Sequence, residues 1–152
     1  MTSTAVSNPV CVVDKLGIAI GGAEPVQLVQ DISFSIPRGG YFALVGESGS
    51  GKSITCHALM RLLPFKPRID GRILIDGKDV WAMKQPEIIS FRRKTVGMVF
   101  QDPLAALNPV RTIGSQMLET LRLYYPGASN ADLHARAVKA LEDVHIPQAE
   151  KR

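Results

Sequence analysis

The order of hydrophobic and polar positions predicts β-strands in the first part of the chain. Residues 10–13 are a short apolar run, and residues 31–36 alternate polar and apolar, which is typical of a strand with one buried face. Residues 41–45 and 96–100 are continuous apolar runs, as expected of central strands covered on both faces. We therefore predict strands at these four places, with a turn at residues 37–40.

A hairpin and several helices complete the predicted elements. Asp76-Gly77 lies between residues 72–75 and 78–80, and this dipeptide favours a two-residue turn between antiparallel strands. Helices are predicted where apolar residues recur at helical spacing or where helix-forming residues end at a proline, over residues 52–63, 87–94, 112–125 and 130–144. Strands and helices in this order predict an α/β fold.

An octapeptide between residues 41–45 and the next helix has the pattern G-x-x-x-x-G-K-[ST] at every fixed position. It consists of Gly46, Glu47, Ser48, Gly49, Ser50, Gly51, Lys52 and Ser53. Its glycines let consecutive backbone N–H groups converge on phosphate oxygens. A flexible Gly/Ser linker is the alternative, but a strand before it and a helix after it favour a phosphate loop.

The loop predicts a nucleotide and Mg²⁺ as ligands, with all eight residues at the nucleotide. The Lys52 ammonium would reach the β- and γ-phosphates, and the Ser53 hydroxyl would ligate the Mg²⁺ that bridges them. The helix that begins near Lys52 adds the positive end of its dipole.

Asp102 is a competing candidate for a metal ligand. It follows an apolar run, as does the magnesium-binding aspartate of many phosphate-loop enzymes. However, Gln101 comes directly after the run, Pro103 follows, and no second acidic residue stands beside Asp102. We therefore do not assign Asp102 to the metal.

The chain has 152 residues, of which 45% are hydrophobic. This length and composition are typical of one domain or of part of a larger one. No apolar stretch approaches the roughly 20 residues that span a bilayer, and the first nine residues lack the order of a signal peptide. We expect a cytosolic chain.

Cys11 and Cys56 have no metal-binding spacing, so both are expected to be buried apolar residues.

The formal net charge of +4 does not predict a nucleic-acid partner. The basic residues are scattered, and the one cluster, Arg92-Arg93-Lys94, has only Phe91 as an aromatic neighbour. We interpret this cluster as a solvated helix face.

Several motifs together resemble the ATP-binding subunits of ABC transporters. They are the phosphate loop, residues 96–103, Leu107-Asn108-Pro109 and Thr112-Ile113-Gly114. The run QDPLAALNP over residues 101–109 is especially similar to the importers of dipeptides, oligopeptides and nickel. The resemblance implies a RecA-like phosphate-loop NTPase core with an antiparallel β element over residues 1–111, and the start of a helical subdomain over residues 112–152.

The same resemblance implies a site and partners. Gln101 would be the Q-loop glutamine, a catalytic residue that contacts Mg²⁺ and the attacking water where the ATPase meets the membrane subunit. The function implied is ATP hydrolysis that drives import of peptides or a related small solute. The partners implied are membrane permease subunits, a second ABC ATPase subunit and, indirectly, an external solute-binding protein, with the chain at the cytoplasmic face of the inner membrane.

The sequence departs from the family pattern in two places. Ile20 stands where the family usually stacks an aromatic residue on adenine. The sequence also ends at Arg152, before the signature motif, the magnesium-binding aspartate, the catalytic glutamate and the switch histidine of the family. We therefore expect the N-terminal part of a longer subunit, which alone would hydrolyse little ATP and cover its apolar strands poorly.

Three other functions remain open at this point. A small phosphate-loop kinase would transfer labelled phosphate to a small acceptor. An ABC-type ATPase of DNA repair or translation would co-purify with nucleic acid, although Leu107-Asn108-Pro109 argues against it by resemblance. A non-hydrolysing nucleotide-binding module would bind ATP without releasing phosphate.

Overall fold

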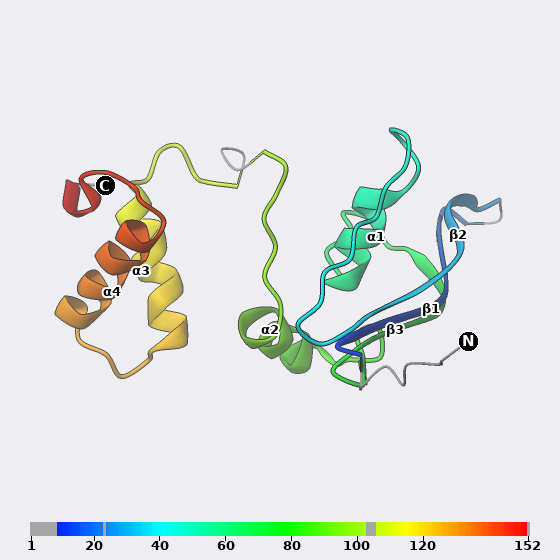
Figure 1. Cartoon of the computed structure of the whole chain (residues 1–152), viewed down its shortest axis with the longest axis horizontal. Coiled ribbons are helices and arrows are strands. Elements are labelled where there is room, and N and C mark those ends of the chain that lie inside the picture. Colours follow the sequence, from blue (N-terminus) through cyan, green and yellow to red (C-terminus); the bar gives the residue numbers. More distant parts are fainter. Residues whose placement is uncertain (1–8, 23, 103–105, 152) are drawn as a thin grey trace. The chain divides into compact units, whose positions relative to one another are not determined.

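The computed structural model describes residues 9–22, 24–102 and 106–151, and it divides the chain into two compact units, Met1–Val96 and Gly97–Arg152. Each unit has buried apolar residues of its own. Figure 1 shows the sheet, α1 and α2 in the first unit, and α3 and α4 in the second.

The first unit is built on one antiparallel sheet with the strand order β2-β1-β3-β4. β1 pairs with β2 on one side and with β3 on the other, so that Cys11 lies between Ile36 and Ile75. The predicted strands at residues 10–13 and 31–36 are confirmed, and both are longer than predicted. The strands are β1 (Cys11–Ile20), β2 (Val26–Ile36), β3 (Arg68–Ile75) and β4 (Lys78–Asp79).

The predicted hairpin is confirmed as β3 and β4. Leu74 pairs with Asp79 and Ile75 pairs with Lys78. Asp76 and Gly77 both have positive φ, 47° and 74°, as a two-residue turn between right-twisted strands requires.

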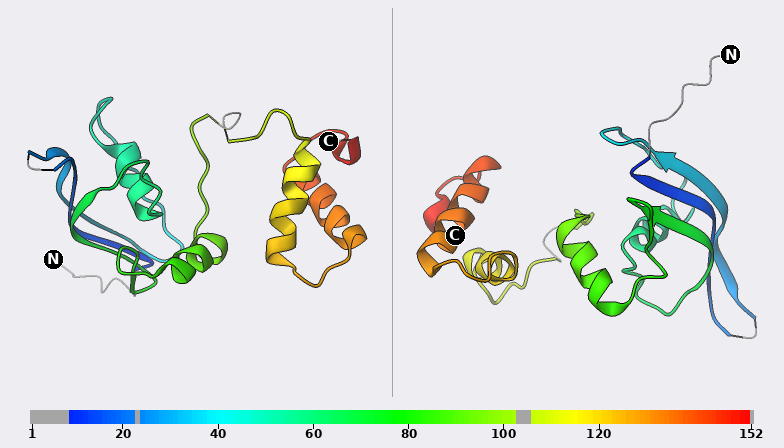
Figure 2. Two further views of the ribbon diagram at one scale, coloured as in Figure 1. Left: turned by 180° about the vertical axis from the view of Figure 1, so that it is seen from behind. Right: turned by 90° about the horizontal axis from the view of Figure 1, so that it is seen from below.

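Two helices cover one face of this sheet, as Figures 1 and 2 show. They are α1 (Lys52–Leu59) and α2 (Gln85–Lys94), and the backbone N–H of Lys84 caps α2 by donating to the Glu87 carboxylate over 2.8 Å. Apolar side chains from both layers form the core, among them Leu16, Ile18, Ala58, Ile73, Val80, Ile88 and Phe91. α1 is shorter than predicted, because the helical hydrogen bonding ends in a turn at Met60 and Arg61.

The two strands predicted at residues 41–45 and 96–100 are wrong: neither segment is a strand in this structure. Tyr41, Val45 and Val99 are almost fully exposed, at 101%, 88% and 92%. A strand forms only when a neighbour accepts and donates its ladder hydrogen bonds. The strands of the described residues all belong to one sheet, and that sheet pairs with neither segment.

The second unit contains α3 (Ile113–Tyr124), α4 (Asn130–Asp143) and the short helix η1 (Ala149–Lys151). The predicted helices 112–125 and 130–144 are confirmed to within one residue at each end. Both start at a hydroxyl cap: Thr112 accepts from Ser115 N and Ser129 accepts from Asp132 N. The Ser129 hydroxyl also donates to the Asp132 carboxylate over 2.7 Å, which lowers the pKa of Asp132.

We predict that Gly71→Ala strongly destabilises the first unit. Gly71 has φ +77°, and a Cβ there would lie 2.2 Å from the Lys15 carbonyl oxygen and 2.4 Å from that of Asp14, at an irregularity in the β1–β3 pairing. Gly77→Ala is the matched control, because Gly77 has a similar φ of +74° and nothing within 4 Å of its Cβ position. The control should lose about 1–2 kcal/mol from the left-handed backbone alone.

Gly71→Ala should lose about 1–3 kcal/mol more than the control, since the backbone of β1 must move. Urea unfolding at equilibrium gives both free energies of unfolding. Equal losses in the two variants would show that β1 does not approach Gly71 as closely as the structure places it.

Candidate nucleotide-binding site

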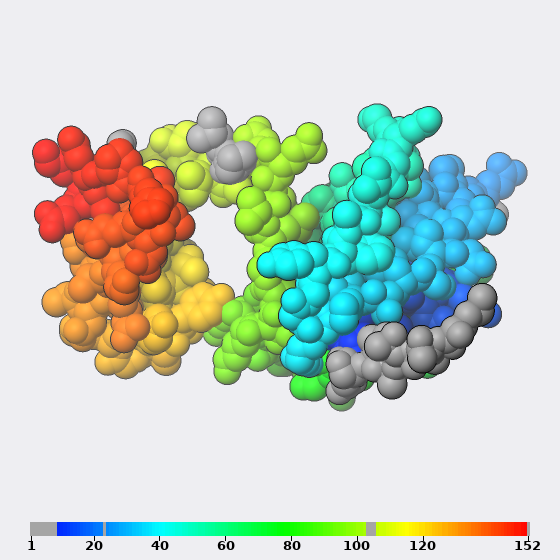
Figure 3. All heavy atoms as spheres, in the orientation of Figure 1, coloured from blue at the N-terminus to red at the C-terminus, as the bar shows by residue number. Residues whose placement is uncertain are grey.

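The phosphate loop lies on the surface of the first unit. Residues 41–50 are all exposed; they run alongside α1 and then turn back into its N-terminus (Figure 1). Figure 3 shows the same segment in cyan on the surface. The predicted position of the loop, directly before a helix, is therefore confirmed, although residues 41–45 immediately before it are not a strand.

Gly51 fixes the point where α1 begins. It is the N-cap residue, buried, with φ 87°. A Cβ at this position would lie 2.9 Å from the Leu28 carbonyl oxygen and 2.9 Å from the Val29 Cγ2 atom of β2. Both the amide and the hydroxyl of Thr55 donate to the Gly51 carbonyl, over 2.8 and 2.9 Å. The N-terminus of α1 is thus packed on β2 where only glycine fits.

The loop closes around the side chain of Lys52. The ammonium donates to the Gly46 carbonyl over 2.8 Å, to the Ser50 hydroxyl over 3.2 Å and to the Glu47 carbonyl. The Ser50 amide donates to the same Glu47 carbonyl over 3.2 Å. The structure therefore brings four of the predicted binding residues together, with the positive charge at the centre of the loop.

The N-terminus of α1 fits an anion. The first N–H groups of a helix have no acceptor within the helix, and they carry its positive partial charge. The Gly51 cap supplies no side-chain hydrogen bond, and the first turn holds no acidic residue that would repel a phosphate. Lys52 adds a full charge at the same end. A phosphate group is the ligand that this arrangement favours.

Ser53 fits the role of a single hydroxyl ligand to Mg²⁺. It is exposed in the first turn of α1, next to Lys52. Among the residues that the structure describes, no three His, Cys, Asp or Glu side chains are grouped so that they could hold a metal. A Mg²⁺ on Ser53 would take its remaining ligands from phosphate oxygens and water, which is the usual way that nucleotide sites hold it.

Gln101 and Asp102 lie in the second compact unit and are exposed. The phosphate loop lies in the first unit. The catalytic and metal-binding role of Gln101 stays a prediction. Pro103 lies outside the described residues. Ile20 is the half-buried last residue of β1, where it pairs with Val26.

Sequence reasoning missed the part played by Arg92. We expected a solvated face, but Arg92 is half-buried and its guanidinium donates to the carbonyls of Met60, over 2.9 Å, and Arg61. One signal could have found it: Arg92 lies four residues after the buried Ile88 and so shares its helix face. Arg92 is therefore a link between α2 and the end of α1.

The expectation for the cysteines is half right. Cys11 is buried in β1, and burial raises the pKa of its thiol. Cys56 is exposed on α1, so the prediction that it is buried is wrong. The buried face of α1 is formed instead by Thr55 and Ala58.

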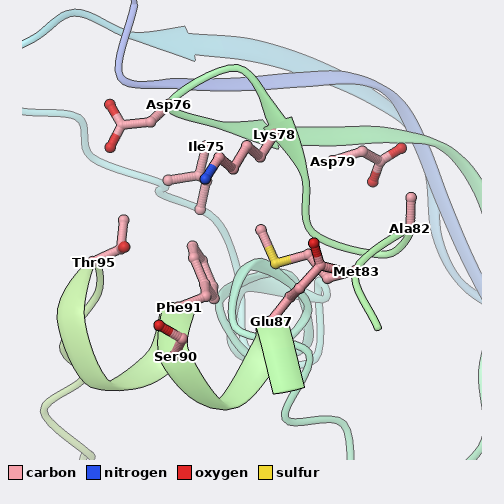
Figure 4. A pocket seen from close by; sticks show the side chains of 10 residues that line it. All are labelled: Ile75, Asp76, Lys78, Asp79, Ala82, Met83, Glu87, Ser90, Phe91 and Thr95. Atoms are coloured by element: carbon pink, nitrogen blue, oxygen red, sulfur yellow. The ribbon is translucent and has the colours of Figure 1, made fainter. Parts of the chain in front are cut away.

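A cavity of about 580 Å³ lies between the β3–β4 hairpin and α2 (Figure 4). Its acidic groups already have partners: Asp79 accepts from Trp81 N, Glu87 accepts from Lys84 N, and Asp76 forms an ion pair with Arg38. These carboxylates therefore form hydrogen bonds and an ion pair within the protein. The phosphate loop is thus the stronger candidate for a functional site.

A phosphate loop closed on a lysine at the start of a helix defines a nucleotide-binding protein of the phosphate-loop class. The chain matches the ABC transporter family over residues 29–152, and it belongs to that family. In the described residues, no helix is long and apolar enough to span a membrane.

Curated relatives narrow the family. The chain is 42% identical over 129 residues to the oligopeptide transport ATP-binding protein OppD of Bacillus subtilis (strain 168), covering 84% of this chain and 36% of the relative. It is 38% identical over 146 residues to the probable D,D-dipeptide transport ATP-binding protein DdpD of Escherichia coli (strain K12), covering 94% of this chain and 44% of the relative. The predicted likeness to the dipeptide and oligopeptide branch is confirmed.

Solved structures give the same fold. The dimeric structure of MJ0796, a bacterial ABC transporter cassette, matches with a TM-score of 0.74 and 26% identity, over 87% of this chain and 56% of that one. The structure of cbiO1 from Clostridium perfringens matches with a TM-score of 0.70 and 24% identity, over 95% and 53%. The predicted α/β fold of an ABC ATPase is confirmed.

We predict that Lys52→Ala weakens the binding of Mg-ATP by about 1.5–3 kcal/mol, because a charged hydrogen-bond donor to phosphate is lost. Ser53→Ala should weaken binding chiefly when Mg²⁺ is present. Calorimetric titration of the folded protein measures both affinities. Lys66→Ala, which removes an exposed lysine outside the loop, is the control. Unchanged affinity in both loop variants would remove the phosphate-loop assignment.

Proposed function

We propose that this protein is the ATP-binding subunit that powers an importer of peptides or a related small solute by ATP hydrolysis. The observation that carries the proposal is the phosphate loop closed around Lys52 at the N-terminus of α1, in a member of the ABC transporter family. The solute class is supported by the names of OppD and DdpD, which are oligopeptide and D,D-dipeptide transport proteins. The chain spans 36% and 44% of the length of these two curated relatives.

Different parts of the loop bind the phosphates and the Mg²⁺. The backbone from Gly46 to Ser53 surrounds the phosphates, and Lys52 exchanges its bonds to the loop carbonyls for bonds to phosphate oxygens. The Ser53 hydroxyl holds Mg²⁺, which neutralises phosphate charge when it is bound. A second solved structure of MJ0796, 26% identical to this chain, is a post-hydrolysis state bound to ADP and phosphate, which supports a nucleotide as the ligand.

Hydrolysis and its partners form the next part of the proposal. In this proposal Gln101 would contact Mg²⁺ and the attacking water, at the place where the ATPase would meet a membrane permease subunit. A second ABC ATPase subunit completes the pair, which the dimeric MJ0796 structure supports. An external solute-binding protein acts indirectly, nucleic acid is not a partner, and the subunit works at the cytoplasmic face of the inner membrane.

We divide the chain by function into residues 1–111, the catalytic core with its β element, and residues 112–152, the start of a helical subdomain. The helical part begins at the Thr112 cap of α3. The boundary between the two compact units falls earlier in the sequence, between Val96 and Gly97. The described residues 97–102 and 106–111 thus belong to the core by proposed function and to the second compact unit in the structure.

The proposal predicts that Gln101→Ala lowers ATP hydrolysis and transport while leaving ATP affinity within about threefold, since its role is to place water and metal rather than to bind nucleotide. The test uses the complete transporter in vesicles, with ATP inside and labelled oligopeptide outside together with the solute-binding protein. Phosphate release and peptide uptake are measured for the wild type, Gln101→Ala and Lys52→Ala.

Asp102→Asn is the matched control, because it changes the neighbouring side chain without removing the glutamine. A collapse of ATP affinity in Gln101→Ala, together with loss of Mg²⁺ dependence in Asp102→Asn, would transfer the metal role to Asp102. Absence of ATP-driven peptide uptake by the wild-type transporter would refute the proposed function.

A further inference from the structure

The C-terminal end of α1 is held by a side chain of α2. Arg92 donates from Nε to the Met60 carbonyl over 2.9 Å and from its terminal nitrogen to the Arg61 carbonyl. These carbonyls follow the last turn of α1, where a helix carries negative partial charge and unsatisfied acceptors. Hydrogen bonds from a charged donor are among the stronger ones, and two from one rigid guanidinium also fix direction.

Two further contacts hold the same end of α1. The Trp81 indole N–H donates to the Ala58 carbonyl over 3.1 Å. Arg61 donates to the Met83 carbonyl over 2.6 Å, and its guanidinium lies 5.6 Å from the centroid of the Trp81 ring. The end of α1 is thus joined by directional polar contacts to α2 and to the segment that leads into it.

α1 is short enough to move as one body. Its 8 residues span about 12 Å at the usual rise of 1.5 Å per residue. Lys52 and Ser53 are at one end and the carbonyls bound by Arg92 follow the other. A displacement of α1 would therefore carry Met60 and Arg61 with it, and through them would reach Arg92.

We propose that Arg92 is a positioning residue that transmits movement of the phosphate-loop helix to α2. α2 ends at Lys94, seven positions before Gln101, so α2 leads directly into the segment with the predicted catalytic glutamine. The link rests on the proposed function, since it concerns the same nucleotide site, and it adds a route from bound nucleotide to hydrolysis. Arg92 lies on α2, outside the phosphate loop, and it donates to backbone carbonyls.

The experiment compares Arg92→Met, Arg92→Lys and the control Arg93→Met in the full protein within its transporter. Arg93→Met removes the same charge from the next position of α2. In the hydrogen bonds of the described residues, the Met60 and Arg61 carbonyls after α1 accept from Arg92 and not from Arg93. Three quantities are measured: the affinity for Mg-ATP, the turnover number for hydrolysis, and amide hydrogen exchange of residues 85–94 with and without Mg-ATP.

In the wild type and in Arg93→Met, Mg-ATP should slow exchange in α2. In Arg92→Met this slowing should be lost and turnover should fall about 10- to 100-fold, the effect of misplacing a reacting group by about 1 Å. Affinity for Mg-ATP should stay within about threefold, because the phosphate loop is intact. Arg92→Lys, which keeps the charge but loses the fork of donors, should give an intermediate result.

Three outcomes would overturn the link: an ATP-dependent slowing in Arg92→Met equal to that of the wild type, the same losses in Arg93→Met, or an affinity loss above tenfold, which would mean that Arg92 supports the loop itself. If Arg92→Met does not fold, a full wild-type response in Arg92→Lys overturns it.

The exchange readout separates this proposal from the proposed function. A wild type that imports no peptide, but whose α2 responds to Mg-ATP only when Arg92 is present, would refute the importer and support the link. If the wild type imports peptide, and Arg92→Met matches the wild type in turnover and hydrogen exchange, the importer would be supported and the link refuted.

Discussion

The close contact between Gly51 and β2 is the constraint on which the nucleotide site depends. A phosphate loop needs a fixed helix N-terminus, because its N–H groups must point at one place. Here the helix N-terminus is fixed because residue 51 packs against β2 too closely for a side chain. A Cβ on residue 51 would lie 2.9 Å from the Leu28 carbonyl oxygen. The antiparallel sheet, which does not itself bind nucleotide in this proposal, thereby sets where α1 begins.

The two ends of α1 are held in different ways, and this difference has a physical reason. At the N-terminus, the exposed loop closes on Lys52 with hydrogen bonds that a phosphate can replace. At the C-terminus, Arg92 and Trp81 satisfy carbonyls from half-buried positions, where losing a partner costs more than it does in water. At the N-terminus of α1 a phosphate can replace the hydrogen-bond partners of Lys52, whereas the hydrogen bonds at the C-terminus stay in place.

Local pattern predicted much of this chain, and non-local pairing explains what it missed. The Asp76-Gly77 hairpin, the caps of α3 and α4 and the phosphate loop are each specified by a few neighbouring residues, so their positions followed from the sequence. Residues 41–45 and 96–100 are apolar enough for buried strands, but a strand also needs a partner, and the described sheet supplies none. Arg92 was missed because its acceptors are backbone atoms about 30 residues away. The spacing from Ile88 marks the helix face of Arg92, but the sequence does not show which atoms it binds.

The contact of Trp81 with the end of α1 gives the chain a built-in optical reporter. Trp81 is the only tryptophan of these 152 residues, so the indole emission of this part of the protein comes from one place. Its indole N–H donates a hydrogen bond to the Ala58 carbonyl, its ring lies beside the Arg61 guanidinium, and Trp81 is half-buried. Indole emission depends on hydrogen bonding and on nearby charge, so the colour and intensity of this single fluorophore follow the state of the helix that carries the phosphate loop, without any added dye.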